Sequence, residues 1–70
     1  MTNIEFARLV AKYRAMYDVR LVDLSAKTDL SLTTLVKIEK NGACLLRNKI
    51  LIAKALNFSR EDLEKVLNSK

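Results

Sequence analysis

The sequence is short of the residues on which several classes of protein depend. Its 70 residues include no histidine, no proline, no tryptophan, one cysteine and one glycine. One cysteine without histidine is too few for a zinc site, a disulfide framework or a redox pair. So little proline, glycine and aromatic content argues against sandwiches, barrels and collagen-like chains. No apolar run exceeds four residues, so we expect no transmembrane helix and no signal peptide.

The same scarcity argues against catalysis. The chain has no histidine, no glycine-rich phosphate loop and no paired nucleophile and base. We therefore expect a protein that is not an enzyme and that uses no cofactor and no metal.

The composition that remains is that of one small globular domain over residues 1–70. Half of the residues are hydrophobic and 30% are charged, which is unlike a disordered chain. A chain of this length buries only about 60% of the surface that its unfolded form exposes. Because such small cores are often supplemented by association, a homodimer and a heterodimer both stay open.

The charge is positive and unevenly distributed. The formal net charge is +5, and residues 1–57 hold the whole surplus, with ten basic and five acidic residues. A basic surplus of this kind favours a polyanionic partner.

The pattern of apolar residues predicts five helices, over residues 3–17, 21–28, 32–40, 46–56 and 60–68. Thr2 and Glu5 match a capping box. Ser31 and Ser59 are expected N-caps, and Asn41-Gly42 is an expected helix stop. The predicted fold class is all-α. The residues expected on the inward or apolar sides are Phe6, Leu9, Val10, Tyr13, Met16, Tyr17, Leu24, Leu35, Ile38, Leu46, Ile50, Ala53, Leu56, Phe58, Leu63, Val66 and Leu67.

Residues 21–40 have the pattern of a helix-turn-helix. Two helices that cross on a tight turn need a small residue at the crossing, and Ser25 occupies that place. The turn needs a residue that tolerates the left-handed conformation, and Asp29 is among the less unfavourable choices. The apolar residues expected to pin the two helices to the core are Leu24, Leu30, Leu35 and Ile38.

This stretch resembles the helix-turn-helix of the Cro and repressor-type family, the lambda-repressor-like fold of phage and bacterial regulators. The resemblance continues through Ile38-Glu39, Asn41-Gly42 and residues 52–59. It implies a compact five-helix lambda-repressor-like domain. It also implies a transcription regulator of a phage-type genetic switch, acting in the cytoplasm of a bacterial host cell.

In that family the second helix of the motif enters the major groove of operator DNA. Carried over by position, the base contacts would come from Ser31, Leu32, Thr33, Val36 and Lys37. The phosphate contacts would come from Arg20, Lys27, Lys40, Arg47, Asn48 and Lys49.

The sequence departs from the family at apolar positions. Leu21 stands where the family often has glutamine, and Val22 follows it. Residues 32–40 contain no arginine, glutamine or asparagine, the usual bidentate readers of bases. Leu32 and Val36 stand where polar readers are usual. If all four apolar side chains share one exposed face, their burial favours a protein partner.

A second hypothesis follows, in which the chain resembles phage modulators of repression, or anti-repressors. Such a protein binds a repressor in place of DNA. Asp23, Asp29 and Glu39 would then pair with basic residues of that repressor. Both hypotheses stay open, as does the simpler alternative in which Leu21 and Val22 pack against the end of the first helix.

Overall fold

The structure is a computed structural model of the chain, and it describes residues 1–68. Its five helices are α1 (Asn3–Tyr17), α2 (Leu21–Thr28), α3 (Leu32–Asn41), α4 (Leu46–Ala55) and α5 (Arg60–Leu67). No strand occurs within residues 1–68, so the predicted all-α class is confirmed. The predicted ends differ by one residue in three helices, since α3 is longer and α4 and α5 are shorter.

The helix starts follow from local side-chain chemistry. At the start of α1, the Thr2 amide donates to the Glu5 carboxylate at 2.9 Å, and the Glu5 amide donates to the Thr2 hydroxyl at 3.2 Å. This reciprocal pair is the predicted capping box, and it satisfies two amides that a helix start leaves without partners. Ser31 and Ser59 cap α3 and α5 in the same manner, through their hydroxyl oxygens.

Three helix ends use left-handed residues other than glycine. They are Asp18, Asp29 and Asn57, with φ of 53°, 61° and 58°. The fourth left-handed residue is Gly42, with φ of 71°. A Cβ added to Gly42 would lie 1.7 Å from the carbonyl oxygen of Asn3. Glycine is therefore required there, because the end of α3 lies directly on the start of α1.

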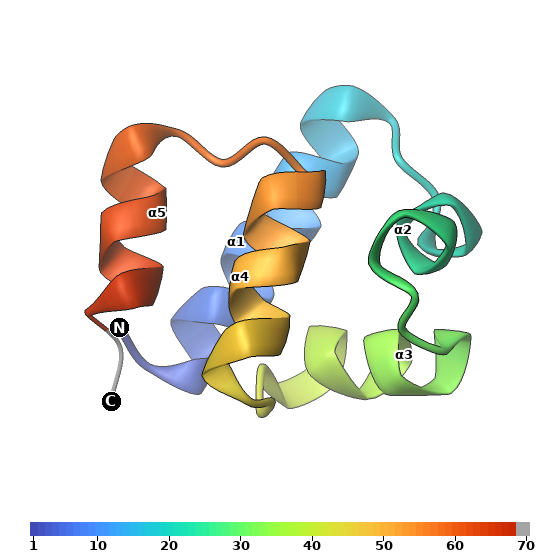
Figure 1. The fold of residues 1–70 in the computed structure, drawn as a ribbon, viewed down its shortest axis with the longest axis horizontal. Coiled ribbons are helices and arrows are strands. Elements are labelled where there is room, and N and C mark those ends of the chain that lie inside the picture. Colours follow the sequence, from blue (N-terminus) through green and yellow to red (C-terminus); the bar gives the residue numbers. More distant parts are fainter. Residues whose placement is uncertain (69–70) are drawn as a thin grey trace.

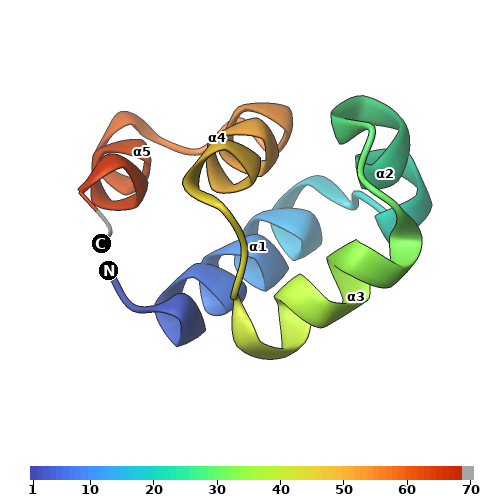
Figure 2. The same cartoon turned by 60° about the horizontal axis from the view of Figure 1, so that its bottom comes forward.

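The helices surround α1, which runs through the middle of the molecule. In Figure 2, α3 lies on one side of α1 and the α4–α5 pair lies on the other. The α2 helix sits at one end, against α3 and α4 (Figure 1). All five helices contribute almost fully buried residues, and the largest of these side chains are Phe6, Val10, Leu24, Leu35, Ile38, Ile52, Leu56 and Val66.

Several predicted inward positions are wrong. Leu67 is 51% exposed and Leu46 is 43% exposed. Ile52, which was not among the residues expected inward, is fully buried. Met16 and Tyr17, at the end of α1, are also about half exposed, because the apolar side of α1 extends beyond the core. The other residues expected inward are buried or packed against the core. No helix in the described part of the chain is long and apolar enough for a membrane span.

Candidate interface on helices α2 and α3

Hydrogen bonds of two side-chain hydroxyls and one backbone amide hold the connection between α2 and α3. The Ser25 hydroxyl donates to the Leu30 carbonyl at 2.6 Å. The Thr28 hydroxyl donates to the Leu24 carbonyl at 2.8 Å and accepts from the Leu30 amide at 3.3 Å. Asp29 adopts the predicted left-handed conformation. Leu30 is packed against the core, so α3 begins from a fixed point. Thr28 was not predicted, although its place in the last turn of α2 is a usual one for such a hydroxyl.

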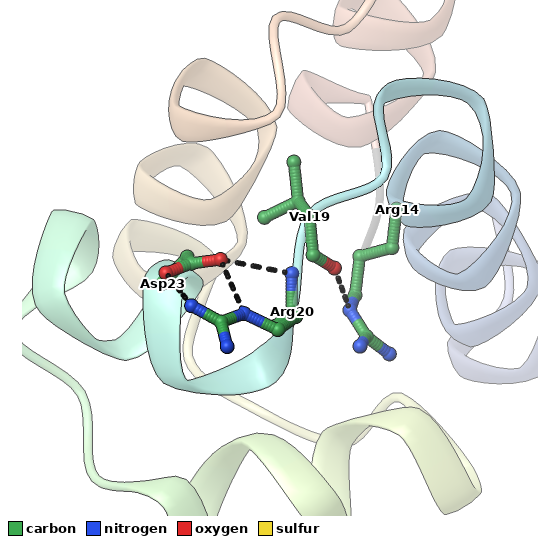
Figure 3. Close-up of polar contacts among 4 residues, drawn as sticks. All are labelled: Arg14, Val19, Arg20 and Asp23. Carbon is green, nitrogen blue, oxygen red and sulfur yellow. Dashed lines mark hydrogen bonds and ion pairs between the residues drawn. The ribbon is translucent and has the colours of Figure 1, made fainter.

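Arg14 connects α1 to this pair of helices. Its Nε donates to the Val19 carbonyl at 2.9 Å, in the segment that leads into α2 (Figure 3). Its guanidinium also forms an ion pair with Glu39 of α3, and both side chains are 23% exposed. The second hypothesis expected Glu39 to pair with a basic residue of a repressor, but its carboxylate is already engaged within the protein.

Asp23 is engaged as well, at the start of α2. Its carboxylate accepts from the Arg20 Nε at 3.2 Å and from the Arg20 amide at 3.3 Å (Figure 3). The hydrogen bonds from Arg20 lower the pKa of Asp23, since they favour the charged carboxylate. Arg20, expected as a phosphate contact, therefore already has a counter-charge.

The outer face of α3 lies opposite the buried Leu35 and Ile38. Helical geometry places five residues on this face, all of them exposed: Leu32, Thr33, Val36, Lys37 and Lys40. Leu32 and Val36 are 46% and 43% exposed, and they stand one turn apart. Four of the five predicted base contacts thus share one open surface. The fifth, Ser31, is exposed, but its hydroxyl caps α3 and donates to the Thr34 hydroxyl at 2.8 Å.

The two apolar residues predicted as contacts at the start of α2 differ in burial. Leu21 is partly buried and packs against the core, whereas Val22 is 50% exposed.

The residues predicted as phosphate contacts also differ in burial. Lys27, Lys40 and Arg47 are exposed, and within residues 1–68 none of them forms an ion pair. Asn48 is partly buried.

Lys49 differs most from the expected surface position, because it is only 5% exposed. Its Nζ donates to the Asn3 side chain at 3.0 Å and lies 5.6 Å from the centre of the Phe6 ring. The residue falls on the buried side of α4, where the aliphatic stem can pack while the ammonium finds polar and aromatic neighbours.

The site is therefore an uncovered helix face with two aliphatic side chains, a hydroxyl and two lysines, next to acids that are mostly compensated. No group of three potential metal ligands occurs among residues 1–68. Compared with protein-family models, with curated proteins and with solved structures, the chain matches none of them.

Proposed function

We propose that the chain is a small helix-turn-helix transcription regulator that binds operator DNA through the outer face of α3. On this proposal α2 and α3 form a helix-turn-helix of the Cro and repressor type, and α3 enters the major groove. The protein is not an enzyme and needs no cofactor. It acts in the cytoplasm of a bacterial host cell, as part of a phage-type genetic switch.

One observation carries this proposal: the outer face of α3 is uncovered, and the free charge around it is positive. Lys37 and Lys40 lie on the face, and Lys27 and Arg47 are exposed on the helices before and after it. The nearby acids Asp23 and Glu39 are compensated by arginines. Asp29, exposed at the turn before α3, forms no ion pair within residues 1–68, so the four free cations outweigh one free acid. Such a surplus suits the phosphate backbone, which supplies most of the affinity for DNA.

Fluorescence anisotropy with a randomised 20-base-pair duplex pool tests this function. Four phosphate contacts give a salt slope near −3.6, so affinity should fall by about a hundredfold between about 50 and 200 mM salt. Changing Lys27 or Lys40 to glutamine should reduce that slope by about one unit each. Arg60→Gln on α5 is the matched control, since α5 lies at the other end of the molecule from α2 (Figure 1). No binding by the folded protein at 50 mM salt would overturn the proposal.

The exposure of Val22, Leu32 and Val36 favours a second candidate, in which the chain is a modulator that binds a repressor. This candidate predicts no duplex binding at 50 mM salt and a complex with the purified repressor encoded beside it. Leu32→Arg combined with Val36→Arg should abolish that complex. Tight duplex binding with a steep salt slope would favour the first candidate.

A further inference from the structure

We infer that Leu32 and Val36 recognise the methyl groups of thymine, and that the preferred DNA is therefore rich in thymine at the positions that α3 contacts. This inference rests on the proposed function. It adds the chemical group that the outer face of α3 would distinguish in the major groove.

The first argument is the chemistry of the exposed side chains. Leu32 and Val36 are 46% and 43% exposed and neither can donate or accept a hydrogen bond. The C5-methyl group of thymine is the one apolar group that base pairs present in the major groove. Burying each side chain against bare base edges would desolvate polar groups without replacing their hydrogen bonds, which is unfavourable. A methyl group avoids that penalty.

The second argument is spacing. Residues four apart on a helix rise by about 6 Å, and successive bases on one strand rise by about 3.4 Å. Leu32 and Val36 therefore match two methyl groups that stand one or two base steps apart.

The third argument is charge, which favours DNA over a protein at this face. Lys37 and Lys40 share the face with the two aliphatic residues, while Glu39 is turned to Arg14. An apolar centre next to free cations suits a groove in which methyl groups lie between two rows of phosphates. A basic repressor surface would meet like charge here.

The test compares duplexes that differ in a single methyl group per pyrimidine. Four 20-base-pair duplexes are used: alternating dA–dT, the same with deoxyuridine for thymidine, alternating dG–dC, and the same with 5-methylcytosine. Affinity is measured by anisotropy at about 50 mM salt. Thymine should bind about fourfold more tightly than uracil for each methyl in contact, and about fifteenfold for two. These factors convert about 0.8 kcal/mol per buried methylene-sized group at 1.36 kcal/mol per tenfold. 5-Methylcytosine should exceed cytosine by a similar factor.

Two variants connect the effect to the outer face of α3. Leu32→Ala combined with Val36→Ala should bring the thymine-to-uracil ratio close to one. Leu51→Ala is the matched control, because Leu51 lies on α4 with a similar exposure of 45%, and it should keep the wild-type ratio. Circular dichroism checks that each variant is folded.

The outcomes are distinguishable. If the wild-type protein binds DNA with a thymine-to-uracil affinity ratio of one, the inference is overturned and the proposed function stands. A ratio that Leu51→Ala lowers as much as the double variant does would have the same consequence. No binding to any of the four duplexes would overturn both the inference and the proposed function, and would favour a protein partner for this face.

Discussion

The hydroxyl group of Tyr13 joins α1 to the start of α5. It donates to the Asp62 carboxylate at 2.6 Å and accepts from the Ser59 amide at 2.9 Å. The ring itself stacks on Phe58, with 4.3 Å between centroids. Tyr13→Phe would keep the stacking but remove both hydrogen bonds. We expect it to lower the free energy of unfolding by about 1.5–3 kcal/mol, because one partner is charged. Urea denaturation measures this.

The matched control is Tyr17→Phe on the same helix. Tyr17 is 50% exposed, and its hydroxyl makes none of the hydrogen bonds found within residues 1–68. Its substitution should change the free energy of unfolding by less than about 0.5 kcal/mol. Equal losses in the two variants would contradict the role given to the Tyr13 hydroxyl.

Gly42 is required for two separate reasons, its left-handed backbone and the contact with Asn3. A left-handed alanine costs about 1–2 kcal/mol, and the added Cβ would lie 1.7 Å from a backbone oxygen that cannot rotate away. Overpacking of this kind adds about 1–3 kcal/mol. Gly42→Ala should therefore lower the free energy of unfolding by about 2–5 kcal/mol, which a urea titration measures.

Asn57→Gly is the control for that experiment. Asn57 is also left-handed, at φ 58°, so glycine relieves its strain while adding freedom to the unfolded chain. The net change in the free energy of unfolding of Asn57→Gly should stay within about 1 kcal/mol. A Gly42→Ala variant as stable as the wild-type protein would show that α1 and α3 can separate at this point.

At the residue scale, the sequence predicted what depends on near neighbours. The capping box at Thr2, the caps at Ser31 and Ser59, and the left-handed Asp29 each follow from a few adjacent residues. The left-handed Asp18 was not predicted, although aspartate tolerates this conformation better than most residues.

At the scale of elements, Arg14 links α1 to α3 and to the segment before α2. Its side chain contacts the segment before α2 and ion-pairs with Glu39 of α3. We expect a double-mutant cycle of Arg14→Gln and Glu39→Gln to give a coupling energy of about 1–2 kcal/mol, since both groups are three-quarters buried. Thermal or urea unfolding of the four proteins measures it.

Arg20 and Asp23 form the control pair for this cycle. Their side chains are 76% and 43% exposed, so water and salt weaken their attraction. Their coupling energy should be smaller and should fall further at high salt. A larger coupling energy for the exposed pair would contradict the assignment of Arg14 as the connecting residue.

The outer face of α3 should accept charge without loss of the fold. We expect Leu32→Arg combined with Val36→Arg to leave the helical circular dichroism and the cooperative unfolding unchanged, because both side chains already contact solvent. If this face binds DNA as proposed, the added cations should strengthen non-specific binding and steepen its salt dependence. Unfolding of the double variant would show that these residues belong to the core.

Helix α4 shows why an element can be predicted and part of its buried side missed. Of the four residues expected on one side, Ala53 and Leu56 are buried and Ile50 packs against the core, while Leu46 is exposed. The buried side also contains Lys49 and Ile52, which were not expected there. A lysine in the buried series breaks the apolar period, and only the contact with Asn3 and Phe6 makes its burial favourable.

At the scale of the whole molecule, acid should destabilise the fold. The pKa of Glu5 is lowered by the Thr2 amide and hydroxyl, that of Asp23 by Arg20, and that of Asp62 first by the Tyr13 hydroxyl. Groups whose pKa is lower in the folded state contribute stability above their unfolded pKa values, near 4, and this contribution is lost as the pH falls through the folded values. The urea midpoint should therefore be higher at pH 6 than at pH 3.

Asp62→Asn is the variant that separates this effect from general charge repulsion. It should lower the midpoint at pH 6 and flatten the profile between pH 5 and pH 3, because the titrating group is gone. A profile that is unchanged by this substitution would contradict the part given to Asp62.

Of the candidate site, the sequence predicted the exposed positions on α3, but it missed the burial of Lys49 and the compensated charges. The open positions on α3 follow from its period, since Leu35 and Ile38 define the inward side. The pairing of Arg14 with Glu39 joins residues far apart in the sequence, so no local pattern indicates it. Charge was therefore the least predictable property of this surface.

The dipeptide at the end of α3 also connects folding to chemical ageing. Asparagine followed by glycine is prone to lose its side-chain amide, because the small glycine lets its own backbone nitrogen attack that side chain. Here the Gly42 amide donates to the Ile38 carbonyl at 2.6 Å, and the Asn41 side-chain oxygen accepts from the Ala43 amide at 2.9 Å. Both reacting groups are held in other bonds while the last turn of α3 is closed. Deamidation must then wait for that turn to open, and its rate in a stored sample reports how often the last turn of α3 opens.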